Sequence, residues 1–485
     1  MKPNILLIHV DQHRYDCLGF LGNPDVETPH IDELAANSVV YQNSYCSYPV
    51  CTPSRYSLIS GTYSHQHLGW TNHSTMVPSL DTFPKALRAD GYRTKAVGKM
   101  HFTPTYLDVG FSEMVLAEQN GPGRFDDDFH RYLLAKGLVD EIDLMDQERE
   151  FRDEAPPEYW QTFGAVESKL SEENHSTTWI ADQAVETLQS WTEQGSCLMV
   201  GFIKPHHPFD PPEPWSAMYD PDALTLLDGW TESCLARDQA KSEGYFPNSQ
   251  LSEAALRRVM AHYYATISQI DHHVGRLVSI LKEKGIYDNT MIIFTSDHGD
   301  YMGYHHMILK GNYMYEPLAR VPLIIKYPES FRAGTDDRLV SNVDVAPTIL
   351  QQARCSSGRY MCGFDLADEQ WGREYVVAED SFGAEYMVRS RRYKLLVGRD
   401  EKDCLLFDLD TDPYELENRY SDPELQGVVR EMRDQLAAWM LFETPTPAHL
   451  DEEASTIERP NVLGWDPERR HATQERVRRI YDGKE

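Results

Sequence analysis

The sequence predicts an α/β protein with a smaller antiparallel sheet and helix near its C-terminus. Over the first three quarters of the chain, apolar runs of strand length alternate with longer amphipathic segments. Near Glu374 this alternation gives way to short apolar runs separated only by turns. The 485 residues are enough for two domains, or for one large domain with a subdomain.

The first part of the chain contains the elements of the larger sheet. Its predicted strands are residues 5–10, 94–97, 198–203, 291–296 and 321–326. Its predicted helices are residues 33–38, 80–90, 177–191 and 251–284. Gly91 and Gly285 follow two of these helices and favour their termination there.

The second part supplies the smaller unit. Its predicted strands are 375–377, 386–389, 394–397 and 405–408, followed by a helix over 425–441. We therefore expect a large α/β domain over 1–373, a C-terminal subdomain over 374–442 and a charged tail over 443–485. The tail is expected to wrap the surface or an oligomer partner.

Residues 104–175 are acidic, with Gly-Pro-Gly at 121–123, and we expect an irregular insertion over the active-site face. A substrate-selecting lid and a solvated excursion are both consistent with its length and polarity.

The net charge of −31 excludes nucleic acid and anionic membranes as natural partners. An anionic substrate would need a local positive patch. No apolar run approaches the ~18 residues of a membrane helix, and no signal-peptide pattern is present. We expect a cytoplasmic protein, or a periplasmic or secreted one if the N-terminus was trimmed.

The eight cysteines show no Cys-x-x-Cys pairing, so disulfides are not expected.

The segment Cys51-Thr52-Pro53-Ser54-Arg55 is the most informative motif. Arg55 lies one helical turn beyond Cys51 if a helix begins here, where it would hold an anionic group. The alternative is a buried cysteine in a proline-containing turn.

Polar residues follow two of the predicted strands. Asp11 and Gln12 come after the first, and Asp297 and His298 come after the strand over 291–296. Ligands in open α/β sheets gather at the carboxyl ends of strands. Two carboxylates, an amide oxygen and an imidazole suit a divalent cation. Each pair alone is also typical of a helix cap or turn, but both pairs together with the cysteine motif favour a site.

These motifs together resemble type I, formylglycine-dependent sulfatases of the alkaline phosphatase superfamily. The resemblance runs from about Pro3 to about Asn418. It also includes Gly98-Lys99-Met100-His101, Lys204-Pro205-His206, residues 296–300 and Lys310-Gly311. It implies an alkaline-phosphatase-like mixed sheet sandwiched by helices, and a sulfuric ester hydrolase.

The resemblance also implies roles for individual residues. A formylglycine-generating enzyme would convert Cys51 to formylglycine (3-oxoalanine). One divalent cation, Ca²⁺ by preference with Mn²⁺ or Mg²⁺ as alternatives, would have the ligands Asp11, Gln12, modified Cys51, Asp297 and His298. The implied catalytic residues are Cys51, Arg55 as its support, Lys99 and His101 beside the sulfate, His206 as general acid and Lys310 as a sulfate-binding cation. His207 is the alternative to His206.

The implied reaction cleaves a sulfate monoester in two steps. A hydroxyl of the formylglycine hydrate attacks sulfur while His206 protonates the departing alcohol. The sulfated hydrate then expels sulfate as the aldehyde re-forms, with a base such as His101 taking the remaining hydroxyl proton. The expected partner is a small sulfated sugar, aryl or alkyl compound, and a homo-oligomer is left open. Trp70, Asn72 and His73 are candidates for the alcohol pocket, although Trp70 also fits a core position.

Two other functions are compatible with parts of the sequence. Gln12 and His298 keep open a phosphonate monoester or phosphodiester hydrolase with the same nucleophile, whereas Lys99 and His101 favour the sulfatase. A catalytically inactive binding protein of the same fold is disfavoured because every element of the constellation is present.

Overall fold

The computed structural model describes residues 2–119, 124–191, 195–329, 332–444, 446 and 467–484. The Gly-Pro-Gly run at 121–123 and the tail prolines Pro445, Pro447 and Pro460 lie outside the described residues.

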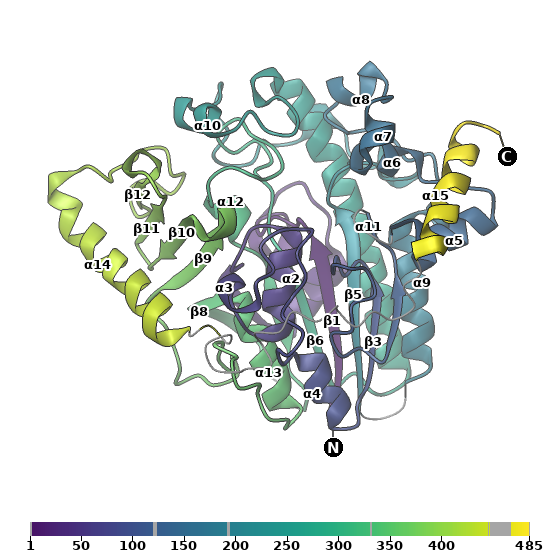
Figure 1. Cartoon of the computed structure of the whole chain (residues 1–485), viewed down its shortest axis with the longest axis horizontal. Coiled ribbons are helices and arrows are strands. Elements are labelled where there is room, and N and C mark those ends of the chain that lie inside the picture. Colours follow the sequence, from purple (N-terminus) through teal and green to yellow (C-terminus); the bar gives the residue numbers. More distant parts are fainter. Residues whose placement is uncertain are drawn as a thin grey trace.

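A mixed eight-stranded sheet forms the centre of the molecule, as predicted (Figure 1). The strand order is β4-β3-β5-β1-β6-β7-β2-β8. Strands β4, β3, β5, β1 and β6 are parallel, and β7 is antiparallel to both β6 and β2. The strands are β1 Asn4–Asp11, β2 Val39–Tyr45, β3 Arg93–Gly98, β4 Glu113–Leu116, β5 Ser196–Pro205, β6 Thr290–Ser296, β7 Leu323–Lys326 and β8 Gly334–Ser341.

Helices cover both faces of this sheet because its central strands are apolar on both sides. Ile5 and Leu7 of β1 pack in one core with α2 (Cys51–Ser60), α4 (Phe83–Ala89) and α13 (Val345–Gln352). Leu6 and Ile8 pack in a second core with α1 (Pro29–Ala36), α9 (Ser176–Gln189) and α11 (Glu253–Glu283). The predicted sandwich of helices around a sheet is therefore present.

The long helix α11 illustrates how the sequence sets an element's limits. The Ser252 side chain caps its start by accepting a hydrogen bond from the Ala255 amide. Gly285, at φ 67°, follows its end in the left-handed conformation that glycine accepts without steric cost.

Two edge regions differ from the sequence-based expectation. Strands β2 and β8 were not predicted, because β2 includes the polar run Gln42-Asn43-Ser44 and the edge strand β8 carries the charged run 336–338. The expected irregular insertion instead supplies edge strand β4 and four helices, namely α5 (Asp128–Ala135), α6 (Glu141–Gln147), α7 (Arg149–Arg152) and α8 (Pro157–Gln161).

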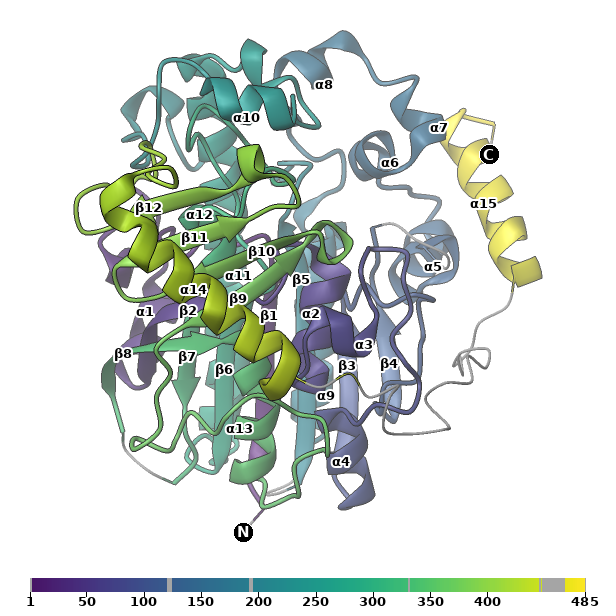
Figure 2. The same ribbon diagram turned by 60° about the vertical axis from the view of Figure 1, so that its left-hand side comes forward.

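The smaller sheet is antiparallel with the order β12-β11-β10-β9, as predicted. Its strands are β9 Val376–Asp380, β10 Glu385–Arg389, β11 Tyr393–Val397 and β12 Leu405–Asp408. Helix α14 (Gln426–Ala438) lies across one face, with a π-helical turn (Trp439–Glu443) at its end (Figure 2). The other face packs against three tyrosines that follow β6, namely Tyr301, Tyr304 and Tyr315.

The other α-helices of the described chain are three short ones, α3 (Ser64–His67), α10 (Ala236–Lys241) and α12 (Glu316–Ala319), and the longer α15 (Pro467–Tyr481). Helix α15 packs on the insertion, where Val477 is buried with Phe125 and Leu134 and Arg469 pairs with Asp126 (Figure 1). Among the described residues, no helix combines the length and apolarity needed to cross a membrane.

Candidate active site

Two adjacent central strands bring the predicted polar pairs together. Strands β1 and β6 are parallel neighbours in register from Asn4 to Val10. Their carboxyl ends therefore lie side by side, with Asp11-Gln12 after one and Asp297-His298 after the other. Helix α2 starts at the same edge of the sheet with Cys51 as its first residue.

The side chains of Asp11, Cys51, Asp297 and His298 converge on one point. All four are fully buried, and one ligand atom from each lies within 4.8 Å of the others. Cys51 Sγ is 3.3 Å from His298 Nε2 and 3.7 Å from Asp11 Oδ1. His298 Nε2 is 3.8 Å from Asp11 Oδ1 and 3.9 Å from Asp297 Oδ1. Such separations suit ligands that share one ion at about 2.0–2.6 Å.

Gln12 joins this cluster through a strained backbone. Its φ of 62° is rare for a residue with a side chain, and the Tyr263 hydroxyl holds the conformation by donating to the Gln12 carbonyl at 2.7 Å. Its side-chain nitrogen donates to Asp300 at 2.6 Å, and its side-chain oxygen faces Lys310 Nζ at 3.1 Å. The amide oxygen is thereby directed toward the cluster.

Arg55 lies behind the cluster. Its guanidinium is fully buried, and donates from Nε to Asp297 Oδ2 at 2.9 Å and from Nη2 to Asp11 Oδ2 at 3.2 Å. Its third contact is to the Lys99 carbonyl at 2.7 Å. Arg55 thus orients the two carboxylates instead of contacting the sulfur of Cys51, and leaves their Oδ1 atoms facing the cluster.

The cations around the cluster keep its carboxylates ionised. Burial alone would raise the pKa of Asp11, but Lys99, Arg55 and Lys310 outweigh it and hold the pKa well below the usual value. The pKa of Asp297 is likewise lowered to about 2, against burial and the Asp11 charge, by Arg55 and His298. Both residues are therefore charged at neutral pH, as metal ligands must be.

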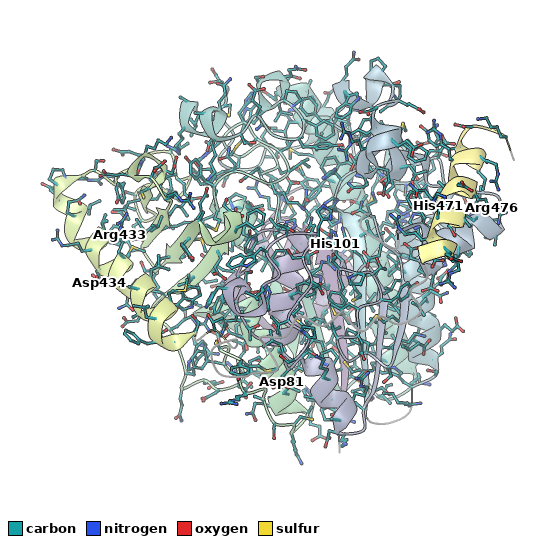
Figure 3. The ribbon with its side chains drawn as sticks, viewed as in Figure 1. Asp81, His101, Arg433, Asp434, His471 and Arg476 are labelled. Atoms are coloured by element: carbon teal, nitrogen blue, oxygen red, sulfur yellow. The ribbon has the colours of Figure 1, made fainter. Side chains whose placement is uncertain are left out.

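The Gly-Lys-Met-His motif follows β3 and lies beside α2. The buried Lys99 Nζ contacts Asp11 Oδ2 at 2.5 Å and Gln119 Oε1 at 2.7 Å. His101, at φ 53°, accepts a hydrogen bond on its carbonyl from Thr52 Oγ1 at 2.7 Å, and its amide donates to Glu118. Figure 3 shows His101 in the middle of the molecule, near the start of α2.

Lys310 contacts three other residues of the predicted site. Its Nζ lies 3.1 Å from Cys51 Sγ, 3.0 Å from His298 Nε2 and 3.3 Å from His206 Nε2. Burial and the Asp11 charge raise the pKa of the Cys51 thiol, but Lys310, His298 and Lys99 outweigh them and hold it well below its usual value. The site is thus strongly electropositive in a chain with a large negative charge.

His206 is held in one orientation by its neighbours. Its Nδ1 lies 2.6 Å from the His207 carbonyl, which leaves Nε2 facing Lys310. Its ring stacks on that of His207 at 4.2 Å, and His207 Nδ1 is at ion-pair distance, 2.6 Å, from the buried Asp146 of the insertion. Burial, His207, Lys310 and Lys99 all lower the pKa of His206 far below 6.5. His206 is therefore neutral before an anion binds.

The structure adds four residues that sequence reasoning missed: Glu118, Gln119, Asp146 and Asp300. Asp300 was visible in the Ser296–Asp300 motif, where it supports Gln12. The other three belong to the insertion that was read as irregular, and no motif distinguishes them there. Glu118 and Gln119 follow β4, and the pairing of β4 with β3 brings them into contact with Lys99 and His101.

Comparison with known proteins identifies the class to which this fold and site belong. The fold matches a phosphonate monoester hydrolase of Agrobacterium radiobacter with a TM-score of 0.74 at 23% identity, covering 96% of this chain and all of the other. It also matches a protein solved with its substrate D-glucosamine-2-N,6-O-disulfate, with a TM-score of 0.71 at 20% identity over 90% and 97% of the two chains. The chain therefore shares the fold of these two proteins.

The sequence comparisons resolve the family. Residues 3–355 match the sulfatase family model, and residues 303–440 match the C-terminal model of N-sulphoglucosamine sulphohydrolase. An arylsulfatase of Clostridium perfringens is 30% identical over 89% of this chain and 93% of its own length. A choline-sulfatase of Rhizobium meliloti is 29% identical over 93% and 88%. The chain belongs to the sulfatase family, and it is an enzyme of the sulfuric ester hydrolase class.

Proposed function

We propose that the protein hydrolyses the sulfate monoester of a small alcohol, using formylglycine at position 51 and one divalent cation, Ca²⁺ by preference. The convergence of Lys310 on Cys51, His206 and His298 supports this proposal most strongly. These contacts bring a cation, the proposed nucleophile position and the proposed proton donor within about 3.3 Å of one atom, Lys310 Nζ. The complete Cys51–Arg55 motif at the start of α2 supports maturation of the cysteine.

The residues of the site fit both the proposed divalent cation and the proposed formylglycine. Asp11, Asp297, His298 and the Gln12 amide offer oxygen and imidazole donors, which suit Ca²⁺ and leave Mn²⁺ and Mg²⁺ as alternatives. When bound, the cation would neutralise negative charge at the nucleophile and the sulfate. Formylglycine would supply a hydrate oxygen as nucleophile, which an unmodified thiol does not offer.

The chain's own residues would do the remaining work. Lys310 and Lys99 neutralise the charge that develops on the sulfate oxygens, in a buried site where such preorganised charges act strongly. His206 gives a proton to the leaving oxygen from Nε2, because Nδ1 is engaged by the His207 carbonyl. The binding of an anionic ester offsets the neighbouring positive charges and thus raises the pKa of His206 into a useful range. His101 is our candidate for the base that takes a proton during release of sulfate, and its backbone is anchored beside Cys51 through Thr52.

A second candidate is a phosphonate monoester or phosphodiester hydrolase with the same nucleophile. Gln12 and His298 at the proposed metal positions keep it open. The fold alone does not separate the two activities, because alkaline-phosphatase-like hydrolases of both kinds share it.

One experiment decides between them. The matured enzyme is assayed with 4-nitrophenyl sulfate, a sulfated sugar, phenylphosphonate monoester and a phosphodiester under identical metal conditions, with Cys51→Ser as the control for background. The sulfatase proposal requires the highest kcat/KM on a sulfate ester. A higher kcat/KM on the phosphonate or the diester would establish the second candidate instead.

A further inference from the structure

The turn between β9 and β10 has an unusual backbone. Ser381, Phe382 and Gly383 have φ values of 52°, 59° and 73°, so three consecutive residues are left-handed. Glycine adopts this conformation readily, but Ser381 and Phe382 pay a steric cost for it. Backbone strain of this kind is common at functional sites, where the surrounding structure holds the strained residues in place.

Phe382 displays its ring to solvent on this strained turn. It is 71% exposed, whereas phenylalanine is among the residues most often buried. A strained backbone that holds an aromatic ring out of the core contributes nothing evident to stability. Exposed apolar surface of this kind is typical of interaction sites.

The backbone of Phe382 contacts the segment that leads into α2 and Cys51. The Phe382 amide donates to the Tyr48 hydroxyl at 3.4 Å, and Tyr48 lies three residues before Cys51. The Tyr48 ring is 6.3 Å from that of Trp70. In Figure 2 the β9–β10 hairpin points toward α2, which begins at Cys51.

Trp70 forms the second wall. A Cβ on Gly383 would lie only 3.1 Å from the Trp70 ring, so the turn rests directly against the indole. Trp70 is itself partly exposed, and two residues further on the Asn72 side chain accepts a hydrogen bond from the Thr52 amide at 3.1 Å. The loop carrying Trp70 is therefore anchored beside Cys51.

We propose that Phe382 and Trp70 form a stacking subsite for a ring in the alcohol part of the substrate. The inference rests on the proposed function, because the sulfate must first be fixed at Cys51 for its alcohol to reach this subsite. Aromatic faces bind the flat apolar face of an aryl group or a pyranose sugar, and both share this chemistry. The net charge of −31 disfavours a polysulfated chain at long range, so we expect an alcohol without further sulfates.

The test uses Phe382→Gly in the matured, metal-loaded enzyme. This substitution removes the ring while supplying the residue that the left-handed backbone prefers. We expect KM for 4-nitrophenyl sulfate or glucosamine 6-sulfate to rise about tenfold with little change in kcat, as for lost uniform binding. Ethyl sulfate, which has no ring, should be unaffected, and Tm should stay equal or rise. Which ring substrate responds more distinguishes an aryl from a sugar ligand.

Two matched variants and a binding measurement complete the design. Phe442→Ala removes a ring that is 80% exposed on the turn after α14 and should leave every substrate unchanged. Trp70→Phe should give a smaller KM increase in the same direction. Calorimetric titration with 4-nitrophenol and with glucosamine measures the subsite without turnover, and Phe382→Gly should weaken one of them about tenfold. Equal effects on ring and ringless substrates, or unchanged binding of both ring alcohols, would overturn the subsite. Lack of turnover on every sulfate ester would refute the proposed function instead, while the titration would still decide the subsite.

Discussion

Replacing His206 with alanine tests the assignment of the general acid. The structure leaves only Nε2 of His206 free to face the site, since Nδ1 lies 2.6 Å from the His207 carbonyl. The proton it delivers matters for an alkyl or sugar alkoxide, which is a poor leaving group, and hardly matters for a nitrophenolate. His206→Ala should therefore have an effect that depends on the leaving group.

The expected size follows from the burial of the site. A positioned acid contributes about 10²–10⁴-fold, or ~3–5 kcal/mol of barrier. We place His206 in this range for sugar and alkyl sulfates, because its ring is 4% exposed and water cannot readily replace it. For 4-nitrophenyl sulfate the loss should stay below about tenfold.

The assay measures kcat/KM across sulfate esters whose alcohols span a wide range of pKa. The slope of log kcat/KM against leaving-group pKa should be steeper for His206→Ala than for the unsubstituted enzyme. Lys99→Ala is the matched control, because sulfate is the same in every substrate and the slope should not change. Lys310→Ala should show both effects, since Lys310 Nζ contacts His206 Nε2 as well as the nucleophile position. Equal losses for His206→Ala on all esters would refute the assignment and point to His207 or His101.

Three further predictions follow from the site and its surroundings. Peptide mass spectrometry of protein coexpressed with the maturing enzyme should show residue 51 about 18 Da lighter than cysteine, and full activity with only unmodified Cys51 would contradict the proposed nucleophile. Asp297→Asn should abolish turnover and Ca²⁺-dependent stabilisation, because it removes the charge of a proposed ligand. The circular dichroism spectrum should stay native, because asparagine keeps an oxygen that can accept a hydrogen bond from Arg55. Retention of Ca²⁺ binding would exclude Asp297 as a ligand. His65 links α3 to Glu379 and to the Thr444 carbonyl at 2.9 Å each, and although burial lowers its pKa, the contacts with Glu379 raise it overall. The stability it adds, about 1.5–3 kcal/mol for charged hydrogen bonds, should be complete below pH ~6.5 and be lost as the pH rises through the raised value. His65→Gln should remove this pH dependence from urea unfolding, and an unchanged pH profile would show that His65 is neutral in the folded protein.

The sequence alone was sufficient for the central architecture because its signals are local. The run from Ile5 to Val10 is apolar at every position but His9, which specifies a strand buried on both faces. The 31 residues of α11 carry helical periodicity, a serine cap and a terminating glycine. Edge elements carry weaker signals, since β2 and β8 mix polar residues with apolar ones, and β4 lies in a segment whose composition indicated no regular structure.

The residues of the candidate site were predicted from local sequence, but most of their contacts were not. Asp11, Gln12, Cys51, Asp297 and His298 were predicted together because each follows a strand or belongs to a motif, and parallel pairing of β1 and β6 then brings their strand ends together. Their chemical roles remain predictions. Sequence could not show that Arg55 holds the two carboxylates, that Lys310 touches His206, or that Phe382 lies near Trp70. These relations join residues 44 to 312 positions apart and depend on how loops and the smaller sheet pack. Local sequence determines which strands and helices form and which reactive groups end them, whereas the distances that decide charge, proton transfer and substrate choice arise only from tertiary packing.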